Sequence, residues 1–136
     1  MSAPILPINW DRLAQLKDDL GEESGSFLGE LIHDFLADTP THLSTLERAV
    51  DERNFELMHR SAHTLKSTTG MLGADYLSSL CAVLEEQTAA NEEEGNSQPE
   101  YPSDDWLRAH VQRIVYEYSR VDAALSTAEL SKTESQ

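Results

Sequence analysis

The feature that most constrains this fold is a helical spacing of apolar residues along nearly the whole chain. Leu13, Leu16 and Leu20 recur at steps of three and four residues, and the same spacing returns in later segments. The alternating Val, Ile and Thr runs that indicate strands are missing from the 136 residues. One core is expected for this length. The pattern therefore predicts an all-α fold, an up-and-down antiparallel four-helix bundle with a short additional N-terminal helix.

Capping and helix-breaking residues divide this pattern. A first helix is expected over residues 8–20, ended by Gly21. Pro40 is expected to kink or restart the second helix, and the third should end between Gly70 and Gly73. The expected starts of the second to fifth helices are Ser24 or Ser26, Asn54, Asp75, and Ser103 or Asp104.

These segments are expected to form a single domain over residues 1–128. Residues 91–103 contain four Glu, two Pro and no aliphatic side chain, which predicts a solvated loop. Residues 129–136 are polar and are expected to form a flexible tail.

Charge and composition exclude several classes of partner and compartment. The chain has 10 Lys and Arg against 25 Asp and Glu, a net charge of −15, which disfavours nucleic acid and anionic membrane surfaces. No stretch approaches the roughly 18 apolar residues of a membrane span, and residues 1–10 lack the basic residues of a secretory signal. A cytoplasmic protein is therefore expected. Cys81 has no partner for a disulfide and is interpreted as a buried small hydrophobe.

Motifs of the common phosphate-handling and hydrolytic enzymes are missing. Neither phosphate loop, G-x-x-x-x-G-K-[ST] or G-x-G-x-x-G, occurs in the sequence, and neither does the G-x-S-x-G nucleophile elbow. Kinase and hydrolase activities are therefore not expected.

The third predicted helix holds the most informative residues. One face, turned away from the apolar stripe, combines His59, His63, Lys66, Ser67 and Gly70. His63 should project into solvent with Lys66 about one turn further on. A neutral imidazole is a nucleophile near pH 7, and a lysine offsets the charge of a phosphoryl group. The two small residues would let a second protein approach, with His59 and Arg60 completing the docking surface.

At these residues the chain resembles the signature of histidine-containing phosphotransfer (HPt) domains, approximately H-x-L-K-G-S-S-x-x-x-G-A. The matching residues are His63, Leu65, Lys66, Thr68, Thr69, Gly73 and Ala74. Ser67 is a departure, because the family often has glycine there. The resemblance extends over roughly residues 8–125.

The resemblance implies a four-helix bundle without catalytic activity of its own. His63 would accept a phosphoryl group from a receiver-domain aspartate, of a response regulator or a hybrid sensor histidine kinase, and pass it to another receiver. Mg²⁺ would belong to the receiver, so no cofactor is expected on this chain, which would act as a monomer. In some family members a glutamine on the neighbouring helix orients the histidine; Glu85, Glu86 and Gln87 are the candidates here.

Two alternatives remain open. The first is a non-catalytic module that binds receivers, which is disfavoured because both His63 and Lys66 are present. The second is a di-metal carboxylate bundle, suggested by two Glu-x-x-His motifs on different helices. Its candidate ligands are Glu30, His33, Glu56, His59, Glu85 or Glu86, and Glu117. It is disfavoured because His59 lies off the apolar stripe.

Overall fold

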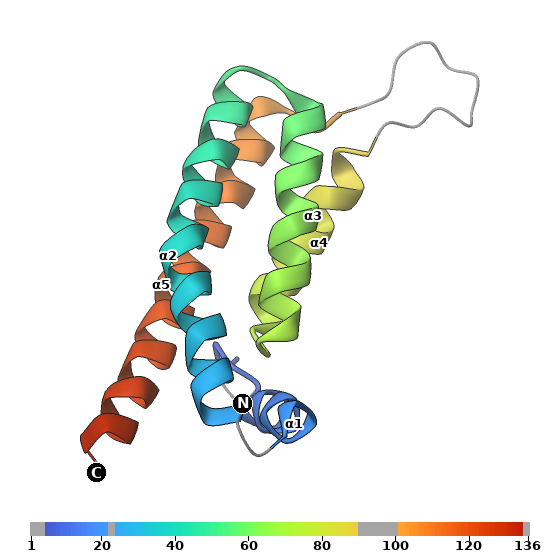
Figure 1. Ribbon diagram of the computed structural model, residues 1–136. Helices are drawn as coiled ribbons and strands as arrows, with labels where there is room; N and C mark the ends of the chain where they lie inside the picture. The colour runs from blue at the N-terminus through green and yellow to red at the C-terminus, as the bar shows by residue number, and fades with distance from the viewer. Residues whose placement is uncertain (1–4, 22–23, 90–100, 135–136) are drawn as a thin grey trace.

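The computed structural model describes residues 5–21, 24–89 and 101–134, with side chains described for all of these except 24–26 and 128–134. Five helices and no strand occur within these ranges (Figure 1). They are α1 (Trp10–Leu20), α2 (Ser24–Asp51), α3 (Phe55–Met71), α4 (Asp75–Gln87) and α5 (Asp104–Glu134). The predicted all-α class and the number of helices are confirmed.

Helices α2 to α5 form the bundle. α2 packs against α3 and α5, and α4 packs against the same two helices, so each helix lies beside its neighbours in sequence. α1 contacts α2 and crosses the end of the bundle at which α2 begins and α3 ends (Figure 1). The helices bury a continuous apolar core in which Leu46, Met58 and Leu65 are almost fully shielded from solvent. None of the described helices combines the length and apolarity needed to cross a membrane.

Polar side chains cap several helix starts. The Asn54 side chain accepts a hydrogen bond from the Leu57 amide at 3.1 Å, and the Ser103 hydroxyl accepts one from the Trp106 amide at 3.1 Å. Both predicted caps are confirmed, with Ser103 rather than Asp104 as the cap of α5. Asn9 caps α1 in the same way, a role that the sequence pattern had not identified.

Helix α2 passes through Pro40 as one continuous helix, so of the two expected outcomes, a kink or a restart, the restart does not occur. Proline has no N–H, which leaves the carbonyl of Leu36 without its partner in the helix. The Tyr118 hydroxyl donates to that carbonyl from α5 at 3.3 Å. A contact between two helices thus replaces the hydrogen bond that Pro40 removes.

Helix α5 is longer than the sequence indicated. Residues 129–134, for which a tail was expected, continue it as helix, in keeping with the good helix propensities of Leu, Lys and Glu in this stretch. Residues 135 and 136 lie outside the described residues. So do residues 90–100, most of the predicted loop.

The segment before α1 is bonded to the turn between α3 and α4. The Asn9 amide donates to the Gly73 carbonyl at 2.7 Å, and the Asn9 side chain donates to Asp75 at 2.9 Å. Arg12 also pairs with Asp75, at 3.0 Å. At the other end of the segment, Arg120 donates to the Ile5 carbonyl at 2.7 Å. These contacts hold the C-terminal end of α3 against the rest of the bundle.

Candidate functional site

His63 lies on the outward face of α3, and its side chain is 61% exposed. Lys66 lies almost one turn further along the same helix and is partly exposed. The interior face of α3 buries Met58, Ala62 and Leu65. The structure therefore brings His63 and Lys66 together on an accessible surface, as their spacing predicted.

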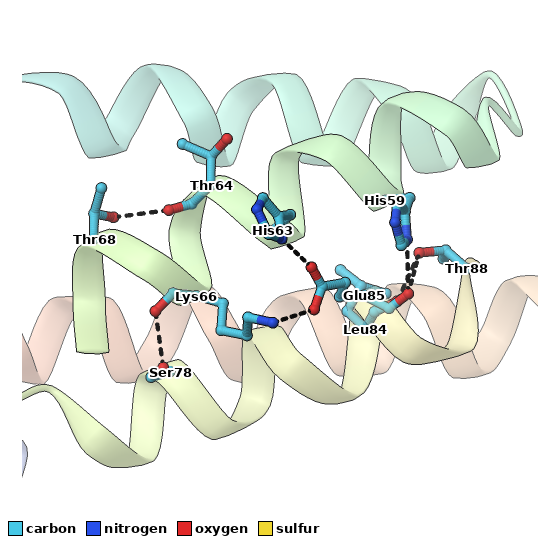
Figure 2. A network of polar contacts seen from close by, with 9 residues as sticks. All are labelled: His59, His63, Thr64, Lys66, Thr68, Ser78, Leu84, Glu85 and Thr88. Atoms are coloured by element: carbon cyan, nitrogen blue, oxygen red, sulfur yellow. Dashed lines mark hydrogen bonds and ion pairs between the residues drawn. The ribbon is translucent and has the colours of Figure 1, made fainter. Parts of the chain in front are cut away.

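Glu85 on α4 links these two side chains (Figure 2). One carboxylate oxygen contacts Nδ1 of His63, and the other accepts a hydrogen bond from Nζ of Lys66 at 2.5 Å. The Glu85 side chain is 16% exposed, whereas Glu86 and Gln87 point to solvent. Of the three candidates left open by the sequence, the geometry selects Glu85.

The pKa of Glu85 is lowered from its ordinary value of 4.5. The hydrogen bond from Lys66 is the main cause, and the contact with His63 adds to it, while partial burial acts in the opposite direction. Glu85 is therefore an ionised carboxylate near neutral pH. A carboxylate can only accept hydrogen bonds, so the neutral His63 ring must donate from Nδ1. The lone pair is then on Nε2.

His59 differs from the expected arrangement. Its ring is half-buried, and Nδ1 lies 2.8 Å from the backbone carbonyl of Glu85 (Figure 2). His59 thus connects α3 to the segment of α4 that bears Glu85. This position gives His59 a structural role beside the site, and the docking role that the sequence suggested for it stays a prediction.

The two small residues after Lys66 lie in different surroundings. Ser67 is exposed beside His63, as expected for an open approach. Gly70 instead faces α4, where a Cβ atom would lie 3.1 Å from the Ser78 hydroxyl. That hydroxyl donates to the Lys66 carbonyl at 2.9 Å. Gly70 therefore permits close packing of α3 on α4, and Ser67 alone leaves space for a partner.

The remaining signature residues have structural roles. Thr69 is buried and donates to the Leu65 carbonyl at 2.6 Å, and Thr68 donates to the Thr64 carbonyl at 3.2 Å. Gly73 has a φ of +83°, and a Cβ atom there would lie 2.8 Å from the Asn9 carbonyl oxygen. Ala74 is fully buried. Thr69, Gly73 and Ala74 thus shape the end of α3 from its buried side, whereas Thr68 is partly exposed.

The residues proposed for a di-metal site do not converge. No group of three or more His, Cys, Asp or Glu side chains suited to a metal occurs in the described residues. Glu117 is buried and pairs with Arg120 at 2.8 Å. Glu30 and His33 are exposed on α2. The geometry gives no support to the carboxylate-bundle alternative.

Comparisons with known proteins agree with this arrangement. The family profile described as "Hpt domain" matches residues 30–124. The crystal structure of the yeast phosphorelay protein YPD1 shares the fold, with a TM-score of 0.64 and 19% sequence identity over 99% of each chain. No curated protein matches. The profile match covers well over half of the chain and includes the His63, Lys66 and Glu85 cluster, so the chain belongs to the Hpt domain family, whose members are histidine-containing phosphotransfer intermediates of phosphorelays.

Proposed function

We propose that His63 is the phosphoacceptor through which this chain carries a phosphoryl group between receiver domains. The observation that supports this most directly is the exposed imidazole whose Nδ1 contacts Glu85, because this contact leaves Nε2 as the nucleophile. The proposal includes a carrier without kinase activity of its own, acting as a monomer in the cytoplasm alongside receiver domains.

The transfer requires positioning and charge neutralisation more than covalent machinery. Nε2 of His63 attacks the phosphorus of a receiver aspartyl phosphate, a bond forms between nitrogen and phosphorus, and the aspartate leaves as a carboxylate. Lys66, within reach on the same face, offsets charge on the phosphoryl oxygens. Under this proposal the receiver supplies Mg²⁺, and this chain supplies the nucleophile and the docking surface.

Arg60 is the cation that we assign to docking. It is exposed almost one turn before His63 and makes no ion pair with any residue that the structure describes, whereas Arg48 and Arg108 pair with Glu52 and Asp51. In a chain of net charge −15, an uncompensated cation beside the acceptor favours the acidic pocket of a receiver. Ser67 leaves that approach sterically open.

The acceptor is tested with labelled phospho-receivers. Wild-type protein should take up acid-labile, alkali-stable label, and His63→Gln should take up none. His33→Gln, which changes another exposed histidine on α2, is the matched control and should label normally. Label on His63→Gln would refute the assignment. Receiver binding without label on the wild type would instead favour the non-catalytic binding module.

The docking surface is tested by reversing charge. Arg60→Glu should slow loading from a phospho-receiver by about tenfold at low salt, and the difference should shrink as ionic strength rises. Arg113→Glu provides the control. Arg113 is also exposed, but it lies on α5, which packs mainly against α2 and α4, and not on the helix that carries His63. Equal loading rates for the two variants would exclude a docking role for Arg60.

A further inference from the structure

Glu85 is placed to do more than orient His63. It is an ionised, mostly buried carboxylate whose two oxygens are shared between Nδ1 of His63 and Nζ of Lys66 (Figure 2). A neutral amide could accept the hydrogen bond from Nδ1 equally well. It would carry no charge to act on the ring after the phosphoryl group arrives. The carboxylate therefore has a consequence for the phosphorylated state that an amide would not have.

The proton balance of the transfer shows where that charge matters. The neutral ring holds one proton, on Nδ1, when Nε2 attacks. Once the bond between nitrogen and phosphorus has formed, the ring bears a positive charge and still holds that proton. When the phosphoryl group moves on, that bond breaks and its electron pair returns to Nε2. With the Nδ1 proton in place, the departing group is a neutral imidazole; without it, the departing group is an imidazolate anion, which leaves far less readily.

We infer that Glu85 keeps the proton on Nδ1 of phosphorylated His63, so that the phosphohistidine stays ready to donate at and above neutral pH. This inference rests on the proposed role of His63 as phosphoacceptor. The charged ring and the carboxylate are in direct contact, and an opposite charge at such short range favours the protonated ring. Glu85 is thus a positioning residue that acts through His63.

The other titratable groups on the neighbouring helix turns make no hydrogen bond or ion pair with the ring among the described residues. On α3 they are His59, which bonds the Glu85 backbone, Arg60 and Lys66. On α4, Glu86 follows Glu85 but is exposed to solvent. No described residue of α2 makes a hydrogen bond or ion pair with the ring.

Lys66 has a second part in this arrangement. Its side chain is partly exposed, and its ammonium group is engaged by Glu85 in the unphosphorylated site. If Lys66 turned toward the phosphoryl oxygens, Glu85 would contact only the ring. Lys66 would then pair with the phosphoryl group, and the charged ring would pair with the Glu85 carboxylate. Loss of the carboxylate would also free Lys66 permanently. That effect is present at every pH at which lysine is charged, so it does not imitate the loss of a ring proton.

The experiment compares wild-type protein with Glu85→Gln, which preserves a hydrogen-bond acceptor for Nδ1 but removes the charge. Both are phosphorylated with phosphoramidate and purified, and transfer to a receiver domain is measured in single turnovers from pH 6 to pH 9. At pH 6 the two rates should agree within a few fold. Above the pH at which the variant's ring loses its proton, its rate should fall by about tenfold for each further pH unit. The wild-type rate should stay level to a higher pH.

Two further measurements make the outcome decisive. Glu86→Gln is the matched control, since it removes an adjacent exposed carboxylate and should retain the wild-type pH profile. ¹⁵N NMR of the phosphorylated ring at pH 8 should show Nδ1 protonated in the wild type and unprotonated in Glu85→Gln. Superimposable pH profiles, or a protonated ring in both proteins, would overturn the inference and leave His63 as acceptor intact. Failure of the wild type to form phosphohistidine would instead refute the proposed function.

Discussion

Replacing Gly73 by alanine is the sharpest test of how the fold supports the site. Gly73 has a φ of +83° in the turn after α3, and a Cβ atom would lie 2.8 Å from the carbonyl oxygen of Asn9. The clash is with backbone, so a side-chain rotation cannot relieve it. The Asn9 segment must move away, and the hydrogen bond from its amide to the Gly73 carbonyl is then lost.

The expected cost follows from these contacts. A residue with a Cβ atom in the left-handed region costs roughly 1–2 kcal/mol, and the lost backbone hydrogen bond costs about 1 kcal/mol. Alanine restricts the unfolded chain more than glycine does, which returns about 0.4–1 kcal/mol. Gly73→Ala should therefore lower the free energy of unfolding by about 2 kcal/mol.

Gly70→Ala, near the end of α3 and three residues before Gly73, is the matched control. Its Cβ atom would meet only the Ser78 side chain, with the hydroxyl nearest at 3.1 Å, and alanine in a helix interior is favoured by about 0.5–1 kcal/mol. The net change should stay below about 1 kcal/mol. Urea unfolding followed by circular dichroism measures both variants, with two-state behaviour checked by a second probe. A loss below 1 kcal/mol for Gly73→Ala, or equal losses for both variants, would refute the reasoning.

Three other predictions concern stability and reactivity. Tyr118→Phe should cost about 1 kcal/mol in urea unfolding, and most of this cost should disappear when Pro40→Ala supplies the missing N–H for the Leu36 carbonyl; an undiminished cost would contradict that account. Because the folded-state pKa of Glu85 is lowered, its ionisation stabilises the protein above the ordinary value of 4.5, and this stabilisation is lost as the pH falls through the folded-state pKa. Thermal melts from pH 7 to pH 3 should therefore show the wild type losing its advantage over Glu85→Gln, and a constant difference would count against the ion pairs. Burial raises the pKa of the Cys81 thiol to about 12, so iodoacetamide should label it only after unfolding, as mass spectrometry would reveal; rapid labelling of the native protein would show that the thiol is accessible.

Local patterns in the sequence determined a large part of this protein. The helical spacing predicted the all-α bundle, and side-chain caps placed the starts of α3 and α5, because both depend on residues within one or two turns of each other. The pairing of His63 with Lys66 on one face is also local, since residues three apart are neighbours on a helix surface. The helix face that carries His63 and Lys66 therefore follows from the amino-acid sequence alone.

Contacts between distant segments were decided only in three dimensions. The choice of Glu85 over its neighbours depends on how α4 is rotated and shifted against α3, and a change of one residue turns a side chain by about 100° around the helix. The partner of the carbonyl left free by Pro40 is Tyr118, which is far away in sequence, and the need for glycine at position 73 comes from the backbone of Asn9. A local pattern describes which face of a helix is apolar, but it does not set the axial position of one helix against another. That packing brings the carboxylate to the histidine.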